Sequence, residues 1–301
     1  MKAIEVRNLR KRYPNHLAVD DVSFEVAEGE IFGILGPNGA GKTTTVECVA
    51  GLRPFDGGSV RVAGLDPRED RDALRRVLGV QLQSAALPEK IKVWEALDLY
   101  ASFYPDPADW RELLDQVGLG GKRDTAFKQL SGGQRQRLSV ALALVGRPRV
   151  AVLDELTTGL DPQARRDTWE LVERVRDSGV TILLVTHFME EAERLCDRVA
   201  LIDAGKVAAT GTPSGLVAQA GGAQRLRFRP TAPVDEAALL ALPEVTEVTV
   251  HGDQVVVTGA GNLAHAVTLA LAGAGIVPGD LRVEQATLED AFLTLTGRTL
   301  S

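Results

Sequence analysis

Near its amino end the chain reads Gly36-Pro37-Asn38-Gly39-Ala40-Gly41-Lys42-Thr43, with Thr44 directly after it. The glycines allow the backbone to wrap so that its N–H groups point at phosphate oxygens. The apolar run 30–35 before the loop predicts a buried strand, and residues 43–52 predict a helix whose N-terminus favours an anion. We therefore predict a nucleotide-phosphate loop in which Lys42 reaches the β- and γ-phosphates and the Thr43 hydroxyl ligates Mg²⁺.

Short apolar runs alternate with amphipathic helical segments on both sides of a helical stretch. The predicted strands are 59–62, 77–83, 150–153, 180–186 and 199–203, and helices are predicted at 162–177 and 189–196. Such alternation favours a mainly parallel sheet with helices on both faces. Residues 3–6 and 22–26 predict an antiparallel start, and about 84–146 predict an inserted helical lobe.

After Gly215 the composition shifts, and Ala220-Gly221-Gly222-Ala223 is typical of a linker. Beyond the linker the patterns run strand, helix, strand, strand, helix, strand, which is the order of a ferredoxin-like unit. Thr287 as an N-cap, Asp290 three residues later and Gly297 as a stop predict a final helix. We expect an α/β chain of two domains, residues 1–220 and a small α+β domain at 221–301.

The predicted strand at 150–153 ends in two acids, Asp154 and Glu155. Adjacent carboxylates at a strand end are costly unless a nearby charge compensates them, and Mg²⁺ with a nucleoside triphosphate supplies that charge. We assign Asp154 as a Mg²⁺ ligand and Glu155 as the group that orients or deprotonates the attacking water. Taken alone, the pair is also compatible with a solvated strand end before a turn.

A second glycine-rich helix start, Leu130-Ser131-Gly132-Gly133-Gln134, lies between the loop and the acidic strand. On physical grounds alone it is either an anion-binding helix N-terminus or a capped helix with a flexible entry. In this order the three segments resemble the ATP-binding cassette (ABC) family, with 130–134 as its signature. The resemblance covers roughly residues 1–220 and implies ATP and Mg²⁺ as ligands and ATP hydrolysis as the activity.

The resemblance also implies roles for single residues, none of which is informative alone. Gln83 looks like the glutamine that joins the two lobes and contacts Mg²⁺ and the attacking water. His187 looks like the switch histidine that senses the γ-phosphate. Thr158-Gly159-Leu160-Asp161 looks like the loop that crosses the dimer interface, and Tyr13 is placed like the aromatic residue that stacks on adenine.

In this family the signature of one copy faces the phosphate loop of another. Ser131 and Gly133 are therefore expected to contact the ATP bound by a second copy. The chain holds one set of segments with both halves of the site intact, which favours a homodimer. One departure is Leu156, because the family usually has proline after the catalytic glutamate. Since Glu155 itself remains, we expect hydrolysis to be retained.

The 301 residues are 45% apolar and 25% charged, with a net charge of −7 and a pI of about 5.3. An acidic chain is a poor candidate for sequence-independent binding of nucleic acid, and no nucleic acid is expected as a partner. No stretch approaches the roughly 18 consecutive apolar residues of a membrane span, so we expect any membrane role to pass through an integral permease subunit. The expected location is cytoplasmic, at the inner face of the membrane. Cys48 and Cys196 lack CxxC or histidine neighbours and are expected to be buried, reduced thiols.

The tail reads Ala286-Thr287-Leu288-Glu289-Asp290-Ala291-Phe292-Leu293-Thr294-Leu295-Thr296-Gly297 and resembles that of type-2 exporter ATP-binding subunits, including the daunorubicin and multidrug efflux group. This favours export of a drug, lipid or polysaccharide-like substrate chosen by the permease. Three alternatives stay open: a soluble cassette ATPase acting on nucleic acid or ribosomes, an importer ATPase, and a regulatory module that binds ATP without hydrolysing it. The lack of a coiled-coil insertion or second cassette in the sequence disfavours the first, and Glu155 with His187 disfavours the last.

Overall fold

The computed structural model describes residues 1–82, 87–222 and 224–297, which divide into two compact units. Unit 1 is Met1–Pro213, and unit 2 begins at Ser214. The boundary predicted from sequence, between residues 220 and 221, falls just after helix α8 (Pro213–Gln219). The sequence patterns did not predict this short helix, in which Leu216 is the buried residue.

A six-stranded sheet forms the centre of unit 1, in the order β5-β6-β7-β3-β8-β9. Its strands are β3 (Ile31–Leu35), β5 (Leu78–Gln81), β6 (Val150–Asp154), β7 (Thr181–Thr186), β8 (Arg198–Asp203) and β9 (Lys206–Gly211). The first five run parallel and β9 is antiparallel to β8. Every residue of β3, β6 and β7 is buried, which explains their nearly continuous apolar sequences. Their carboxyl ends therefore meet at one edge of the sheet.

A three-stranded antiparallel sheet packs beside it in the order β2-β1-β4. Its strands are β1 (Lys2–Tyr13), β2 (His16–Ala27) and β4 (Gly57–Val62), and helix α1 (Lys42–Val49) shares their apolar core. The predicted antiparallel start is thus present, with longer strands than the sequence indicated. Helix α2 (Arg71–Val77) was not predicted, and β5 begins directly after it.

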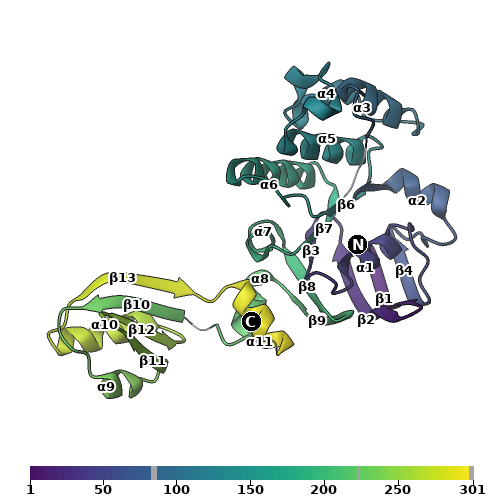
Figure 1. The fold of residues 1–301 in the computed structure, drawn as a ribbon. Helices are drawn as coiled ribbons and strands as arrows, with labels where there is room; N and C mark the ends of the chain where they lie inside the picture. Colours follow the sequence, from purple (N-terminus) through teal and green to yellow (C-terminus); the bar gives the residue numbers. More distant parts are fainter. Residues whose placement is uncertain (83–86, 223, 298–301) are drawn as a thin grey trace. The chain divides into compact units, whose positions relative to one another are not determined.

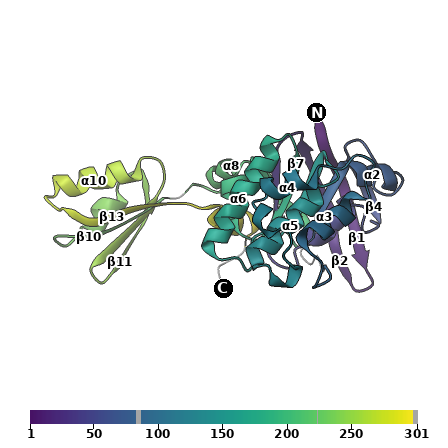
Figure 2. The same cartoon turned by 90° about the horizontal axis from the view of Figure 1, so that it is seen from above.

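The predicted inserted lobe consists of α3 (Val93–Ala101), α4 (Trp110–Gln116) and α5 (Gly132–Leu144), which gather at one end of unit 1 (Figure 1). Trp94 and Trp110 hold α3 against α4, with ring centroids 6.3 Å apart. Seen from above, the lobe lies over the sheets of unit 1 (Figure 2). Helix α6 (Pro162–Asp177) packs against α5, and α7 (Met189–Leu195) packs against α6.

The elements of unit 2 follow the predicted order of strand, helix, strand, strand, helix, strand. They are β10 (Gln224–Pro230), α9 (Glu236–Leu240), β11 (Val245–His251), β12 (Gln254–Gly259), α10 (Leu263–Gly273) and β13 (Pro278–Gln285). The sheet order is β11-β12-β10-β13 with all neighbours antiparallel, as in a ferredoxin-like unit. Leu226 and Phe228 of β10 pack with Val267 of α10 in its core.

The last helix, α11 (Leu288–Thr296), has the ends that its sequence predicts. Thr287 Oγ1 accepts a hydrogen bond from the Asp290 backbone N–H at 3.3 Å, and Asp290 Oδ2 accepts one from the Thr287 N–H at 2.9 Å. Gly297 ends the helix in the left-handed conformation, with φ of 67°. The reciprocal cap and the glycine stop are local features, which is why the sequence predicts them well.

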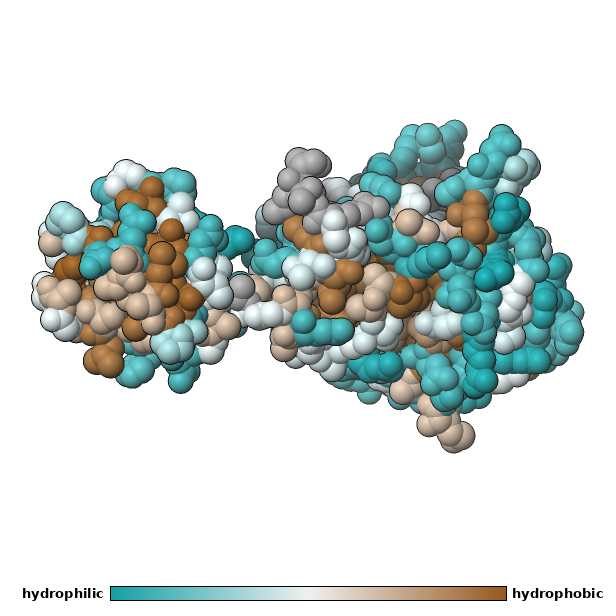
Figure 3. Space-filling view, turned by 90° about the horizontal axis from the view of Figure 1, so that it is seen from below, coloured by the Kyte–Doolittle hydropathy of each residue, from teal (hydrophilic) through white to brown (hydrophobic). Residues whose placement is uncertain are grey.

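Apolar side chains reach the surface of both units between polar ones (Figure 3). The large exposed ones in unit 1 are Met1, Leu52, Leu99 and Phe103. In the part of the chain that the structure describes, no helix combines the length and the apolar character needed to cross a membrane.

Candidate nucleotide-binding site

The glycine-rich loop connects the end of β3 at Leu35 to the start of α1 at Lys42. A Cβ atom on Gly36 would collide with the carbonyl oxygen of Ile202, and one on Gly41 with the carbonyl oxygen of Ala18. Gly41 is also the N-cap of α1 and has φ of 99°, which side chains rarely tolerate. The loop therefore needs glycine at both positions, and no side chain caps the first N–H groups of α1.

Lys42 lies inside the curve of this loop. Its Nζ donates hydrogen bonds to the carbonyl oxygens of Gly36 at 2.8 Å and Pro37 at 3.0 Å, and the residue is only 5% exposed. Burial lowers the pKa of Lys42, while the carboxylates of Glu155 and Asp154 act in the opposite direction. The ammonium group is thus held beside the uncapped start of α1, where phosphate oxygens would replace the two carbonyl acceptors.

A cavity of about 580 Å³ opens over the loop and brings together predicted residues from distant segments. Its lining consists of Tyr13, His16, Ala18, Asn38, Gly39, Gly41, Lys42, Thr43, Thr44, Glu155, Thr158 and His187. His16 and Ala18 were not predicted, and Thr158 was predicted in the loop at the dimer interface rather than in this lining. The position of His16 at the start of β2, directly after the turn that follows Tyr13, was the signal that could have found it.

The Tyr13 ring lies at the rim of the cavity between two cations. Lys11 Nζ is 5.7 Å from the ring centroid and the guanidinium carbon of Arg53 is 5.5 Å from it. These contacts hold the half-buried ring in place. The arrangement fits a surface on which a flat base stacks.

Asp154 ends β6 and is buried, with 1% of its surface exposed. Burial, reinforced by the neighbouring Glu155 carboxylate, raises the pKa of Asp154 to about 6. Among the described residues, none donates a hydrogen bond to its Oδ1 atom. A buried carboxylate oxygen without a donor, close to the hydroxyl-bearing start of α1, suits a hard cation such as Mg²⁺. Asp154 and Thr43 are the residues that would hold it.

Gln81 is a functional neighbour that the sequence analysis missed. It is buried, its Oε1 accepts a hydrogen bond from the Asp154 backbone N–H at 3.0 Å, and its Nε2 donates to the Leu82 carbonyl oxygen at 2.8 Å. The side chain thereby ties the end of β5 to the end of β6. A glutamine inside an otherwise apolar strand was the available signal. Gln83, which was predicted to contact Mg²⁺ and water, lies outside the described residues.

Glu155 and His187 face each other at the ends of neighbouring strands. His187 Nδ1 is 3.3 Å from Glu155 Oε1, and the Thr158 hydroxyl donates to Glu155 Oε2 at 3.4 Å. Glu155 has φ of 50°, and its backbone N–H donates to the Val185 carbonyl at 2.9 Å. This turn aims the carboxylate into the cavity. Leu156, at the position where proline is usual, is buried and packs its side chain into the core.

The segment 130–134 forms a closed cap on α5. The Ser131 hydroxyl accepts a hydrogen bond from the Gln134 backbone N–H at 3.3 Å, and Gln134 Oε1 accepts one from the Ser131 N–H at 3.0 Å. Ser131 and Gly132 are exposed. As far as the described residues go, this segment contributes nothing to the lining of the cavity over the loop. One chain therefore does not bring the two anion-binding helix starts together.

The predicted dimer loop lies beside this segment. Asp161 is the N-cap of α6, and its Oδ1 accepts hydrogen bonds from the backbone N–H groups of Gln163 and Ala164. A Cβ on Gly133 would lie 3.1 Å from that of Ala164. Asp161 at the N-terminus of α6 and the signature at the N-terminus of α5 thus lie on the same surface of the chain.

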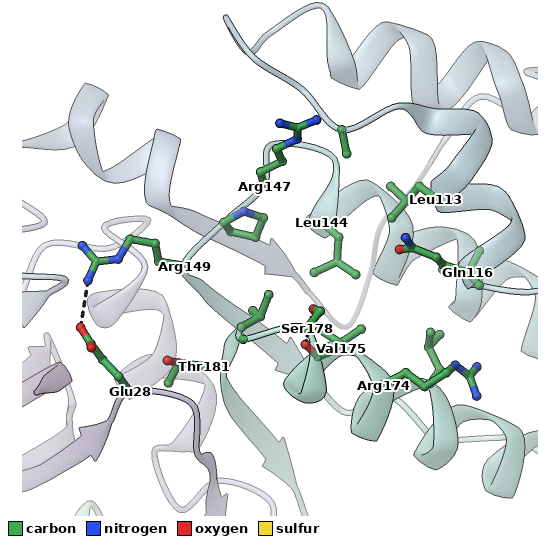
Figure 4. Close-up of a pocket in the computed structure, with 16 residues that line it drawn as sticks. Glu28, Leu113, Gln116, Leu144, Arg147, Arg149, Arg174, Val175, Ser178 and Thr181 are labelled. Atoms are coloured by element: carbon green, nitrogen blue, oxygen red, sulfur yellow. Dashed lines mark hydrogen bonds and ion pairs between the residues drawn. The ribbon is translucent and has the colours of Figure 1, made fainter.

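A larger cavity, of about 670 Å³, lies elsewhere in unit 1 (Figure 4). It is lined by Leu113 and Leu144 of the lobe, by Val175 near the end of α6, and by an ion pair in which Arg149 Nη2 lies 2.9 Å from Glu28 Oε1. The C-terminal ends of α4, α5 and α6 converge there. None of the predicted site residues lines it, so size alone does not locate the nucleotide site.

The two cysteines are buried free thiols, as the sequence predicts. Burial raises the pKa of Cys48 to about 11 and raises that of Cys196 further. Among the described residues, no cluster of three histidine, cysteine or acidic side chains is arranged to hold a metal ion.

Comparison with known proteins identifies relatives over nearly the whole chain. The profile of the ABC transporter family matches residues 19–158. The linearmycin resistance ATP-binding protein LnrL of Bacillus subtilis (strain 168) is 35% identical over 99% of both chains. The daunorubicin resistance ATP-binding protein DrrA3 of Streptomyces coeruleorubidus is 38% identical over 98% of this chain and 96% of its own. The Nod factor export ATP-binding protein I of Paraburkholderia xenovorans (strain LB400) is 41% identical over 99% and 98%.

Solved structures resemble unit 1 in fold. An ATP-binding subunit of an ABC transporter superposes with a TM-score of 0.66 and 29% identity, over 73% of this chain and 93% of its own. A dimeric ATP-binding cassette in a post-hydrolysis state, bound to ADP and Pi, superposes with a TM-score of 0.63 and 25% identity, over 69% of this chain and 98% of its own.

Proposed function

The chain belongs to the ABC transporter family, as the ATP-hydrolysing subunit of an exporter, and we propose that it hydrolyses ATP in a site that a second copy of the chain completes. The observation that carries this proposal is the division of the site. The cavity over the loop gathers Lys42, Thr43, Glu155 and His187, whereas the signature lies on a different, exposed surface.

The chemistry of the first half-site follows from its charges. Lys42 and the N-terminus of α1 neutralise the β- and γ-phosphates, and Mg²⁺ held by Thr43 and Asp154 supplies further charge stabilisation. Glu155 accepts the proton of the attacking water. His187 contacts Glu155 through Nδ1, which supports a role in orienting that carboxylate and sensing the γ-phosphate.

The second half-site is the signature of another copy. Ser131 and Gly133 stand at an exposed helix N-terminus, which favours an anion. Placed over the phosphates of a bound ATP, this helix start would enclose them from the side opposite Lys42. Two copies related by a two-fold axis then hold two ATP molecules, so that binding closes the pair and hydrolysis reopens it.

An integral membrane permease is the second partner. A small cavity of about 250 Å³ beside α2 and β5 is lined by Leu52, Leu74 and Tyr104 among others, and by Arg71 and Arg75 of α2. Leu52 is 57% exposed, and Phe103, next to Tyr104, is 68% exposed. We assign this partly apolar surface to a permease segment that docks from outside the nucleotide site. The chain then lies at the cytoplasmic face of the membrane through that contact.

The exported substrate is chosen by the permease rather than by this chain. The relatives are named for resistance to linearmycin and daunorubicin and for export of Nod factor. We therefore propose a drug, lipid or saccharide-like substrate.

The permease contact is tested by a double variant of the docking surface. Leu52→Asp together with Phe103→Asp should abolish recovery of the chain with its permease while leaving ATP binding intact.

Pairing tests the proposed function directly. The Glu155→Gln variant should bind ATP and Mg²⁺ without turning ATP over, and should sediment as a dimer with ATP and as a monomer without it. Glu155→Gln that binds ATP yet stays monomeric at high protein concentration would remove the basis for a shared site.

A further inference from the structure

Strand β13 forms one edge of the unit 2 sheet, where it pairs only with β10 (Figure 1). Leu281 and Val283 are 40% and 48% exposed on this edge. Apolar side chains on an unpaired strand edge favour addition of another strand, which would satisfy the free backbone groups and cover the side chains.

The charges along this strand are not balanced within one chain. Arg282 lies directly opposite Arg227 of β10, and like charges in that position are unfavourable. Arg227 has an ion pair with Glu284 at 3.5 Å. Arg282 has none with any of the described residues. A countercharge for Arg282 is therefore missing on the open side of the edge.

We propose that β13 pairs antiparallel with β13 of a second copy of this chain, in a register centred on Val283. Arg282 then faces Glu284 of the partner subunit, and the same contact recurs by symmetry on the other side of the axis. Val283 packs against its own counterpart. Each Arg282 gains an acidic neighbour, and two exposed valines become buried.

The strand itself selects this register. Centring the pair on Arg282 would oppose two arginines and would place Asp280 opposite Glu284 of the partner subunit. Centring it on Leu281 would need residues 279 and 280 in the ladder, but β13 has an extra residue between its pairs Arg282–Arg227 and Gly279–Arg229, and Asp280 there has φ of 51°. This bulge interrupts regular pairing, so only the stretch from Leu281 to Gln285 is available.

The opposite edge of the sheet lacks this self-complementarity. Strand β11 carries one acidic side chain, Glu247, and neither lysine nor arginine, so it offers no pair of opposite charges like Arg282 and Glu284. A pairing of five residues is weak alone. The proposed β13 contact rests on the proposed pairing of unit 1. That pairing raises the effective concentration of one β13 for the other, so a weak contact is enough for the two strands to pair.

Cysteine cross-linking of the full chain tests the register. The native cysteines are buried, so Val283→Cys presents a single exposed thiol, and Leu281→Cys is a control of similar exposure. The Val283 pair would lie within disulfide range, whereas the two 281 positions would be roughly 13 Å apart along the strands. We expect a disulfide-linked dimer of Val283→Cys and none of Leu281→Cys. Cross-linking of Leu281→Cys instead, or of neither variant, overturns the proposal.

A charge variant separates pairing from folding. Arg282→Glu places a carboxylate opposite Arg227 within the chain, which should stabilise unit 2, but opposes two acids across the proposed interface. Added to Val283→Cys, it should slow the cross-link and leave or raise the melting temperature. An unchanged cross-linking rate contradicts the proposed contact.

The proposal and the proposed function fail separately. If Glu155→Gln sediments as a dimer with ATP but Val283→Cys does not cross-link, the β13 contact is wrong and the shared ATP site stands. If Val283→Cys cross-links in a chain that ATP does not dimerise, the edge contact stands and the shared ATP site is wrong.

Discussion

The two glycine-rich helix starts of unit 1 look alike in sequence and differ in structure. At α1 the N-cap is Gly41, no side chain caps the helix, and Lys42 lies buried inside the loop. At α5 the N-cap is Ser131, whose hydroxyl and the Gln134 amide close the helix end against each other. The N-terminus of α1 is therefore uncapped and has a buried ammonium group beside it, whereas the N-terminus of α5 is capped by side chains and exposed.

This difference supports the proposal that one chain holds half a site. An anion binds readily where several N–H groups and an ammonium converge, as they do at α1. At α5 the cap already uses some of the backbone N–H groups. Among the described residues, no buried lysine like Lys42 lies beside them. Under the proposal, the helix start at α5 contributes only when an ATP held by another copy of the chain is brought to it.

The largest effects are expected from variants that disable one helix start each. Lys42→Ala should abolish ATP binding because the buried ammonium is the main countercharge of the phosphates. Gly132→Asp should leave ATP binding by the monomer unchanged, because a Cβ there meets only Leu160 at 3.6 Å. Turnover should fall to background in both variants.

Equilibrium binding of a fluorescent ATP analogue and a phosphate-release assay measure the two effects. A Gly132→Asp chain that cannot bind ATP as a monomer would mean that both helix starts belong to one site.

Glu155→Gln should lower turnover by about 10²–10⁴-fold, the usual range for loss of a general base. ATP binding should persist because Lys42 and the loop are untouched. Steady-state phosphate release measures the change, with the exposed Glu170→Gln on α6 as the control. Equal losses in the two variants would argue against a base at 155.

Asp154 provides a smaller, pH-dependent effect in the metal-free protein. Burial raises its pKa from the ordinary value of 3.8 to about 6, so the native state keeps the proton to higher pH than the unfolded chain does. The stability that this protonation contributes is complete below the unfolded pKa and is lost as pH rises through about 6.

Asp154→Asn has no such loss because it stays neutral. With EDTA present, the variant should exceed the wild type in free energy of unfolding at pH 8 by on the order of 2 kcal/mol and match it near pH 4. Urea unfolding at both pH values measures this. A difference that is the same at the two pH values contradicts the assignment of an unpaired buried carboxylate.

The smallest effect concerns the cap of α5. Ser131→Ala should lower the free energy of unfolding by about 1 kcal/mol, the usual cost of losing an N-cap side chain. Ser131→Thr keeps the hydroxyl and should lose less. Unfolding curves that show no difference between alanine and threonine would mean that the cap does not hold the signature in place.

Local sequence patterns predicted the features that depend on nearby residues. The loop from Gly36, the acids at the end of β6 and the caps of α11 each rest on a few consecutive side chains, and the structure has the loop and Glu155 at one cavity. The patterns did not predict α2, in which Leu74 is the buried residue, or β9, which has no buried residue, because neither carries a run of apolar core side chains.

Gln81 shows the limit of the sequence in the site itself. Its role depends on hydrogen bonds to Asp154 and Leu82, which come from the pairing of β5 with β6 over long sequence separation. The roles of Ser131, Asp161 and Tyr13 stay predictions, because one chain without ATP places these residues without showing what they bind.

Mixing two inactive variants tests the shared site most directly. Lys42→Ala has an intact signature and Gly132→Asp has an intact loop, so a dimer of one with the other contains one complete site. With random pairing, an equal mixture should recover up to about one quarter of the wild-type ATPase activity. Each variant alone should stay at background. A mixture that remains at background, although the two chains form mixed dimers, would contradict a site built from two copies.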